Sequence, residues 1–257
     1  MNKFSIAIPT YYSSKFIKNT INPFIGSGVV SEIVISEDSN DELEFNKLTD
    51  ILKSIQQRTS INIRVIRNKD RLGAFHNKFK SIKNCNNSYV YQIDSDNIPG
   101  KNIEDLLKNI EIPNKTIIYP SSIKQFRKLF FNQPYPKEDV ILSKNEVLIN
   151  KNFVKEELKN KKRIQDKDIS WVLNIGNFIV KKSEYVDIVK PKLKEKEFLS
   201  ADAVALSYFW LESGYKIKLL ENFYHYHRKR DDSVSFTEGE NSQISINHFI
   251  EKFKESS

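Results

Sequence analysis

Asp94 and Asp96 stand one residue apart in the stretch Tyr-Val-Tyr-Gln-Ile-Asp-Ser-Asp-Asn at 89–97, where an apolar run ends and a loop begins. If Ser95 is extended, both carboxylates project from the same side of the chain. Close carboxylates repel each other unless a cation lies between them. A hard divalent ion such as Mg²⁺ or Mn²⁺, shared with substrate phosphates, would relieve that repulsion. The alternative is an Asx-rich turn, which is the commoner origin of a bare Asp-x-Asp.

Three further polar clusters also follow apolar runs. They are Thr10-Tyr11, Glu37-Asp38 and the segment 68–71. In an open α/β sheet the carboxyl ends of the strands converge on one crevice. These clusters and the two aspartates could therefore line a single site.

The elements that must position these clusters alternate between strand and helix. Apolar runs and helical spacing predict strands at 4–10, 31–41, 61–68 and 88–93, with helices at 13–25, 41–57 and 73–85 between them. Such alternation predicts right-handed crossovers and an α/β fold, with a mostly parallel central sheet flanked by helices.

Beyond residue 100 the alternation is less regular. We interpret 116–136 and 150–168 as insertions around a second subsite, and 170–185 as a strand around Gly176 or a glycine-marked bulge. The stretch 199–214 is predicted to be a helix, and 215–236 a strand with a basic end. The final stretch is predicted to be an amphipathic helix. Within the helix at 199–214, Ser200 is a candidate N-cap and Gly214 a stop.

The chain contains no internal repeat or low-complexity linker. We therefore expect one domain, with a nucleotide-binding half at 1–100, an acceptor and catalytic half at 101–236 that includes a smaller acceptor-side subregion, and a C-terminal helix at 237–257.

Composition narrows the class of protein. The 257 residues are 39% hydrophobic, which is enough for a sizeable core, and a net charge of +8 favours anionic partners such as nucleotide phosphates, nucleic acid or an acidic membrane. Cys85 is the single cysteine, which excludes an internal disulfide and suits a reducing compartment. Without a signal peptide or a long apolar run, we expect a cytoplasmic protein, at most peripheral to a membrane.

Four motifs, in this order, resemble the nucleotide-binding half of glycosyltransferase family 2, whose members have the GT-A fold. They are Ile-Ala-Ile-Pro-Thr-Tyr-Tyr at 6–12, Glu-Ile-Val-Ile-Ser-Glu-Asp-Ser at 32–39, Arg-Leu-Gly-Ala-Phe-His-Asn at 71–77, and the Asp-x-Asp stretch at 89–97. The resemblance covers roughly the first hundred residues and returns in patches to about residue 236.

The resemblance implies a role for each motif residue on the nucleotide side. Pro9, Thr10 and Tyr11 would shape the uridine pocket, and either Glu37 or Asp38 would accept a hydrogen bond from the base imide. Arg71, Gly73 and Asn77 would support the base and the ribose. In the Asp94-Ser95-Asp96 loop, Asp94 would bind the ribose and Asp96 would bind the metal. The family usually has Asp where Glu37 stands and Arg where His76 stands, so the base-reading acid is open and His76 receives no role. The alternative for Arg71 is a solvated cation.

Asp202 is the residue that the resemblance assigns to catalysis. The family usually has Glu-Asp at this helix start, whereas this chain has Ala201-Asp202. A carboxylate there would be kept ionised by the helix dipole and could take the proton of an acceptor hydroxyl. The alternative is an aspartate that only stabilises the first helical turn.

A basic cluster closes the matching region. His227, Arg228, Arg230 and Ser233 resemble the family's tail, which implies a third metal ligand at His227 and arginines that clamp the diphosphate. The alternative is a basic surface strand or a nucleic-acid patch, and for His225 we favour no ligand role.

The resemblance implies an inverting, Mn²⁺- or Mg²⁺-dependent transfer from a nucleotide-sugar donor, with UDP expected, to a glycan or lipid-linked acceptor. The composition favours bacterial surface polysaccharide or lipooligosaccharide synthesis. Three alternative functions are considered. A nucleotidyltransferase would show a Gly-rich loop after the first strand, and a phosphohydrolase would have its acids after that strand, and this chain has neither feature. The third alternative is a non-catalytic nucleotide- or glycan-binding protein, which the missing acid at Ala201 favours. A nucleic-acid partner is not expected. The basic stretch at 159–163 is interpreted as a solvated helix face, with contact to an anionic membrane as the alternative. The sugar, the acceptor, the linkage and the oligomeric state are left open.

Overall fold

The computed structural model describes residues 2–126, 139–160, 163–164, 167–194, 201–228 and 239–255. They form two compact units. The first unit comprises Met1–Ile112 and Asn177–Val186, and the second comprises Pro113–Gly176 and Asp187–Ser257.

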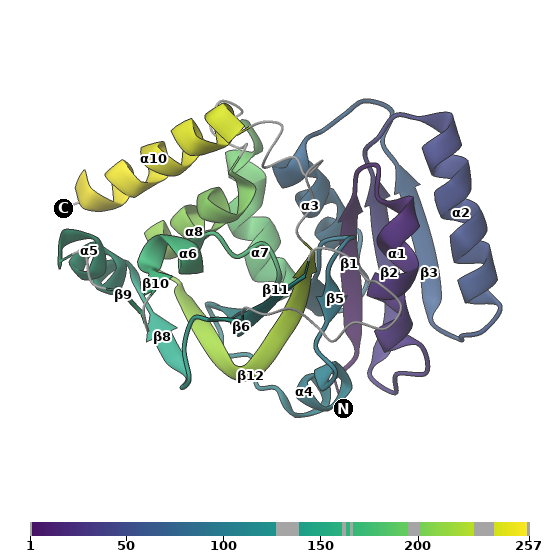
Figure 1. Cartoon of the computed structure of the whole chain (residues 1–257), viewed down its shortest axis with the longest axis horizontal. Coiled ribbons are helices and arrows are strands. Elements are labelled where there is room, and N and C mark those ends of the chain that lie inside the picture. The colour runs from purple at the N-terminus through teal and green to yellow at the C-terminus, as the bar shows by residue number, and fades with distance from the viewer. Residues whose placement is uncertain are drawn as a thin grey trace. The chain divides into compact units, whose positions relative to one another are not determined.

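The first unit contains a five-stranded portion of sheet in the order β3-β2-β1-β4-β11 (Figure 1). Its strands are β1 (Phe4–Thr10), β2 (Val30–Glu37), β3 (Asn62–Arg67), β4 (Tyr89–Gln92) and β11 (Phe178–Lys181). The first four are parallel and β11 is antiparallel to β4. The predicted α/β class and the mostly parallel sheet are confirmed.

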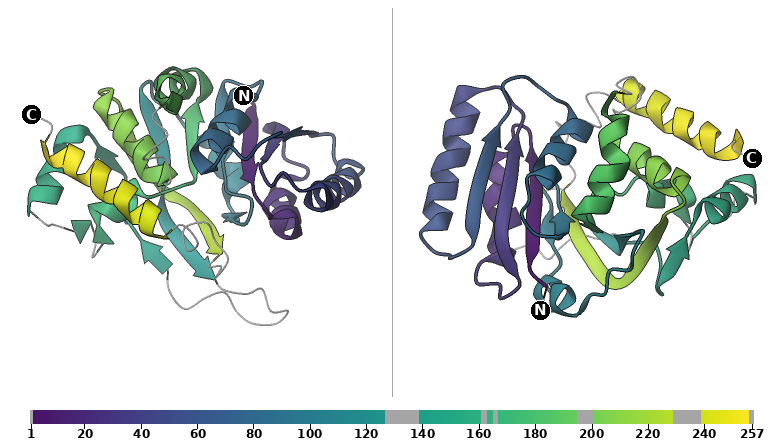
Figure 2. Two further views of the ribbon diagram at one scale, coloured as in Figure 1. Left: turned by 90° about the horizontal axis from the view of Figure 1, so that it is seen from above. Right: turned by 180° about the vertical axis from the view of Figure 1, so that it is seen from behind.

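Helices cover both faces of this sheet. The unit contains α1 (Ser14–Ile21), the 3₁₀ helix η1 (Asn22–Phe24), α2 (Glu42–Gln56), α3 (Ala74–Lys83), the short strand β5 (Ile98–Pro99), α4 (Ile103–Asn109) and the start of α7 (Lys182–Val189). As Figures 1 and 2 show, α1 and α2 lie on one face and α3 on the other. The chain runs outward from β1 to β3 and then returns to β4 on the far side of β1. The strand order therefore reverses between β1 and β4, which is where open α/β sheets bind ligands.

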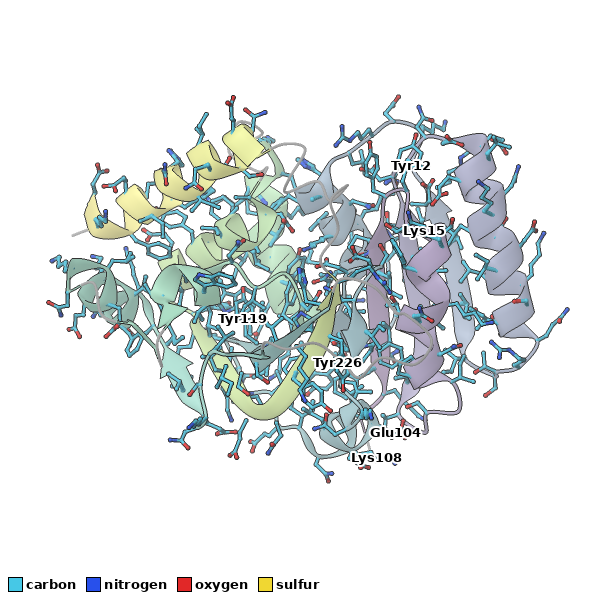
Figure 3. All side chains as sticks on the ribbon, viewed as in Figure 1. Tyr12, Lys15, Glu104, Lys108, Tyr119 and Tyr226 are labelled. Carbon is cyan, nitrogen blue, oxygen red and sulfur yellow. The ribbon has the colours of Figure 1, made fainter. Side chains whose placement is uncertain are left out.

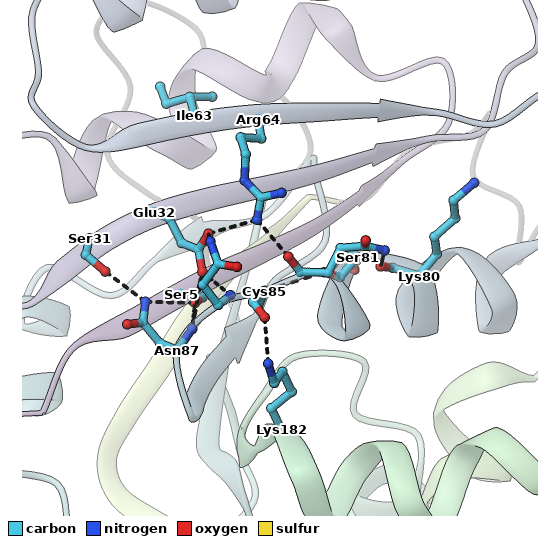
Figure 4. Close-up of polar contacts among 12 residues, drawn as sticks. Ser5, Ser31, Glu32, Ile63, Arg64, Lys80, Ser81, Cys85, Asn87 and Lys182 are labelled. Atoms are coloured by element: carbon cyan, nitrogen blue, oxygen red, sulfur yellow. Dashed lines mark hydrogen bonds and ion pairs between the residues drawn. The ribbon is translucent and has the colours of Figure 1, made fainter.

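A buried polar cluster holds the amino ends of these strands (Figure 4). The Glu32 carboxylate accepts hydrogen bonds from Ser5 Oγ at 2.5 Å, from Asn86 Nδ2 at 2.9 Å and from the backbone amide of Asn86, and forms a 2.9 Å ion pair with Arg64. Burial alone would raise the pKa of Glu32, but the hydrogen bonds from Ser5 and Asn86 and the Arg64 guanidinium outweigh it, so the pKa is lowered. Nearby, burial raises the pKa of the Cys85 thiol to about 12.

The second unit is built around two long parallel strands, β6 (Thr116–Phe126) and β12 (Lys216–Arg228). The short strands β7 (Asp139–Ile141) and β8 (Val147–Ile149) pair antiparallel with β6 and β12, and β9 (Arg163–Ile164) pairs with β10 (Lys167–Asp168). The helices are α5 (Lys151–Asn160), α6 (Ile169–Leu173), the 3₁₀ helix η2 (Lys190–Lys194), α8 (Asp202–Glu212) and α10 (Gly239–Glu255).

Two interpretations of this half are corrected. Residues 116–126 are a strand paired along its length with β12, and so are part of the sheet and not an insertion. The segment 170–185 contains α6 first, because the buried Ile169, Val172 and Leu173 recur at helical spacing, and the strand starts only at Phe178. Gly176 therefore lies in the connecting loop and marks no bulge.

The end of α8 is as predicted. Gly214 has φ +76, its amide donates to Leu211 O at 3.1 Å, and the Tyr215 amide donates to Trp210 O at 3.2 Å. This pair of bonds is the Schellman arrangement, which closes a helix at a residue that must adopt positive φ. The predicted N-cap, Ser200, lies outside the described residues. In the part of the chain that the structure describes, no helix has the length and apolarity to cross a membrane.

Candidate functional site

Backbone hydrogen bonds join the carboxyl ends of β1, β2 and β3 in the first unit. The Asp38 amide donates to Thr10 O at 3.0 Å, and the Asn68 amide donates to Glu37 O at 2.9 Å. The structure thus brings the first three predicted polar clusters to one edge of the sheet.

Asp38 holds the loop that leads into α3. Its Oδ1 accepts hydrogen bonds of 2.8 Å from Asn68 Nδ2 and from the Leu72 amide, and its Oδ2 accepts one of 2.9 Å from the Gly73 amide. Gly73 has φ +81 and ψ 164, a conformation open almost only to glycine. The carboxylate therefore fixes both the loop and the start of the helix.

Asn77 continues the same network from within α3. Its Nδ2 donates to Thr10 O at 3.2 Å, and its Oδ1 accepts a 3.1 Å hydrogen bond from Asn68 Nδ2. Both amide atoms bond to the protein, so these contacts make Asn77 a positioning residue for the strand ends. Asn68 was missed as an individual site residue, although its place directly after an apolar strand was the signal.

Glu37 differs from Asp38 in how its carboxylate is bonded. Glu37 Oε1 accepts a 2.7 Å hydrogen bond from the Ser39 amide, whereas Oε2 is buried and has no hydrogen bond among the described residues. Both side chains are buried, at 1% and 2% exposed. A buried carboxylate oxygen that accepts no hydrogen bond lowers the stability of the folded protein. A ligand N–H that donates a hydrogen bond to this oxygen would remove that cost.

An aromatic and cationic cluster follows β1. The Arg71 guanidinium lies 4.7 Å from the centre of the Tyr11 ring, and the Tyr11 and Tyr12 rings meet edge to face at 4.9 Å. Tyr12 is 43% exposed and has φ 47, an uncommon conformation for a residue with a side chain. In Figure 3, Tyr12 and Lys15 lie at the opposite end of this unit from Glu104 and Lys108 of α4. Pro9, the remaining residue expected here, is buried within β1.

The Asp94-Ser95-Asp96 segment is a turn and not an extended strand end. The Asn97 amide donates to Asp94 O at 3.0 Å, and Thr20 Oγ1 contacts the carbonyl oxygens of Ser95 and Asn97 at 2.8 and 2.7 Å. The premise that an extended Ser95 places both aspartates on one side is therefore wrong. Ser95 is buried, and Asp96 at the turn is partly exposed.

Asp94 is held by residues of α3, of β4, of its own turn and of the loop before β11. Within the turn, its Oδ2 accepts a 3.5 Å hydrogen bond from Asn97 Nδ2. Asp94 Oδ1 lies 3.1 Å from Lys78 Nζ and accepts a 3.2 Å hydrogen bond from Gln92 Nε2, and the Asp94 backbone amide donates to Asn177 Oδ1 at 2.9 Å.

Lys78 and Asn177 were not predicted as site residues. The position of Lys78 on the helix face that carries Phe75 and Ile82 was the signal that its side chain would be buried.

The donor set can be tested against a divalent cation. Among the described residues, no three His, Cys, Asp or Glu side chains gather as a metal site would require. Mg²⁺, however, commonly binds one or two carboxylates and takes its other ligands from water and substrate phosphates. Asp94 and Asp96 are both partly exposed carboxylates of this turn, so the turn offers oxygen ligands of the kind that Mg²⁺ takes from proteins. The metal role of Asp96 stays a prediction.

The remaining predicted residues lie in the second unit. Asp202 is the first residue of α8 and is half-buried. On β12, His227 is half-buried and Arg228 is buried. Burial lowers the pKa of His225 to about 3, with a smaller effect of His227, so His225 is neutral. That His225 has no ligand role stays a prediction. Arg230 and Ser233 lie outside the described residues.

Comparison with known proteins gives both a family and a fold. Residues 5–183, more than half of the chain, match the model of Glycosyl transferase family 2. No curated protein sequence matches the chain.

Two crystal structures of S. aureus TarS 1–349 resemble the fold. The complex with UDP has a TM-score of 0.56 at 15% identity, over 98% of this chain and 65% of that one. The complex with UDP-GlcNAc has a TM-score of 0.53 at 16% identity, over 90% and 60%. The chain thus spans less than two thirds of the length of these TarS chains.

GalNAc-T7 solved with UDP, GalNAc and Mn²⁺ gives a TM-score of 0.57 at 12% identity, over 90% of this chain and 44% of that one. The similarity to GalNAc-T7, like that to TarS, covers most of the present chain. At this low sequence identity it is a similarity of fold. Together with the family match over residues 5–183, these likenesses show that the chain belongs to glycosyl transferase family 2 and has the GT-A fold.

Proposed function

We propose that the protein is a glycosyltransferase that uses a nucleotide-sugar donor, with UDP as the nucleotide. The observation that carries this proposal is the polar cluster at the carboxyl ends of β1, β2 and β4, which includes Tyr11, Asp38 and Asp94. This cluster lies at the edge of the sheet where the strand order reverses between β1 and β4. Family membership supports it, as do the TarS structures with UDP and UDP-GlcNAc.

In this proposal the uracil base lies near the Tyr11 ring and the Arg71 guanidinium, which offer a flat surface for stacking. One carboxylate of the pair Glu37-Asp38 accepts the hydrogen bond of the imide. Glu37 Oε2 has no hydrogen bond within the described residues, whereas three donors already contact Asp38. This difference supports Glu37 as the acid that reads the base.

Asp94 is proposed to accept hydrogen bonds from ribose, and Asp96 to hold a divalent cation at the diphosphate. Bound there, the cation would supply charge stabilisation to the departing nucleotide. GalNAc-T7 was solved with Mn²⁺, which supports a cation in this fold. The assignments of His227 as a further ligand, and of Arg228, Arg230 and Ser233 to the diphosphate, stay predictions.

Asp202 is proposed as the general base. It takes the proton of the acceptor hydroxyl while the hydroxyl oxygen bonds to the anomeric carbon and the bond from that carbon to the diphosphate breaks. A single displacement of this kind inverts the anomeric centre. A glycan or lipid-linked acceptor in bacterial surface polysaccharide or lipooligosaccharide synthesis stays part of the proposal.

Two measurements test the proposal. Calorimetric titration of UDP with and without Mn²⁺ should show binding that the cation strengthens. A screen of UDP-sugars for UDP release, with candidate acceptors present, should then identify a donor that turns over. Absence of UDP binding under both conditions would contradict the proposal.

A second candidate function is a non-catalytic nucleotide-binding protein. Its support is Ala201, which stands beside Asp202 where the family usually has a second acid. Tight UDP binding without UDP release from any donor and acceptor pair would favour this candidate.

A further inference from the structure

Lys78 is a lysine with an unusual environment. It lies in the middle of α3, is 8% exposed, and its Nζ is 3.1 Å from Asp94 Oδ1. Lysine is rarely buried unless its charge is paired. By contrast, Lys83 of the same helix is exposed.

The ion pair joins α3 to the turn that follows β4. The same carboxylate oxygen accepts the 3.2 Å hydrogen bond from Gln92, and the Asn177 side chain holds the Asp94 backbone. An ionised carboxylate has about four acceptor positions. Because the Asp94 side chain is 30% exposed, part of that capacity faces outward from the turn.

We propose that Lys78 is a positioning residue for the ribose of the donor. It fixes the orientation of the Asp94 carboxylate, so that the outward-facing acceptor positions meet the ribose hydroxyls, and it offsets one of the two negative charges of the turn. This inference rests on the proposed function, because it requires a nucleotide at the carboxyl ends of the strands. Lys78 acts through Asp94 and not on the substrate itself.

The rival explanation is an ion pair that only stabilises the fold. The two explanations differ in one measurable quantity, the preference for UDP over 2′,3′-dideoxy-UDP. If Lys78 orients the ribose acceptor, its loss must reduce this preference. If it only stabilises the protein, the preference stays unchanged while the unfolding temperature falls.

The experiment uses the full chain with Lys78→Met, and with Lys83→Met as a control on the same helix. Calorimetric titration of each protein with UDP and with 2′,3′-dideoxy-UDP, both with Mn²⁺, gives two dissociation constants and their ratio. We expect the wild type and Lys83→Met to bind UDP about tenfold more tightly than the dideoxy analogue. Lys78→Met should bind UDP about tenfold less tightly than the wild type and lose most of that preference.

Two further variants keep the test decisive if Lys78→Met does not fold. Lys78→Arg retains the charge and should restore much of the preference. The double variant Lys78→Met/Asp94→Asn removes both charges, so it leaves no carboxylate without its lysine partner and should fold, yet show no preference for UDP.

The outcomes separate the two proposals. UDP binding by Lys78→Met with the wild-type preference would overturn the role of Lys78 alone, as would a double variant that retains the preference. Failure of the wild type to bind UDP at all would overturn the proposed function, and the role of Lys78 with it.

Discussion

The Asp38 carboxylate, at the end of β2, accepts a 2.9 Å hydrogen bond from the amide of Gly73, 35 residues later in the chain. This contact joins the second strand to the start of α3 at a glycine with φ +81. The two acids that sequence leaves equivalent therefore have different surroundings, because Asp38 is bonded to the neighbouring loop and Glu37 is not.

Asp38→Asn should destabilise the protein by about 2 kcal/mol, because an amide NH₂ replaces an acceptor that faces backbone N–H donors. UDP affinity should fall with it, since the loop at 70–73 loses its anchor. Urea unfolding and UDP titration measure the two effects.

Glu37→Gln is the matched variant, and it should leave the free energy of unfolding within about 1 kcal/mol of the wild type, because Gln can still accept from the Ser39 amide. Its UDP affinity should fall if Glu37 reads the base. An Asp38→Asn protein as stable as the wild type would contradict the anchoring role.

Gly73→Ala should cost about 1–3 kcal/mol through backbone strain alone. A Cβ at this position would meet no heavy atom within 4 Å, so a steric clash is not the cause. Gly28→Ala is the control, because its Cβ would make an ordinary 3.7 Å contact with Glu104 Oε1 and its φ is not positive. Thermal unfolding of the two variants should differ clearly, and equal unfolding temperatures would refute the strain argument.

Asp96→Ala should lower metal-dependent sugar transfer by about 10²-fold or more without unfolding the chain. Asp96 lies in a partly exposed turn, so little packing is lost. UDP release measured against Mn²⁺ concentration checks this, with Asp105→Ala on the exposed side of α4 as the control. Full activity in Asp96→Ala would show that another residue holds the cation.

Asp202→Asn should reduce kcat by about 10²- to 10⁴-fold while UDP affinity stays unchanged, because a general base acts on the acceptor and not on the nucleotide. Glu212→Gln at the other end of α8 is the control, since its 2.6 Å pair with Lys151 is partly exposed and contributes little. A parallel loss of UDP binding in Asp202→Asn would indicate a structural role in place of catalysis.

Glu32 predicts a pH dependence of stability. Its pKa is lowered from the ordinary 4.5 in the folded protein, so its contribution is fully present above that value and is lost as the pH falls through the folded pKa. Glu32→Gln should therefore be less stable than the wild type by about 2 kcal/mol at pH 7, with the gap closing in acid below pH 4.5. Urea unfolding at a series of pH values tests this, and a constant gap would contradict it.

Much of the fold of the first unit can be predicted from local pattern. The apolar runs at 4–10, 31–41, 61–68 and 88–93 all contain parallel strands, because a short run of apolar residues is a local feature of the sequence. The same reasoning failed at 170–185, which was predicted to be a strand but begins with α6. A short apolar run fits a helix and a strand equally well, so only its packing in the folded protein determines which one forms.

Sequence alone also determined that polar residues stand at the ends of these strands, since that requires only the order of residues along the chain. The tertiary structure decided what each of them does. Asp38 meets Gly73, and Asp94 meets Lys78 and Asn177, across separations that no local pattern records. Helical spacing puts Lys78 on the apolar face of α3 with Phe75 and Ile82, but the sequence does not name its partner. It became the partner of Asp94 because strand order brings α3 against the end of β4, where an unpaired charge would be costly.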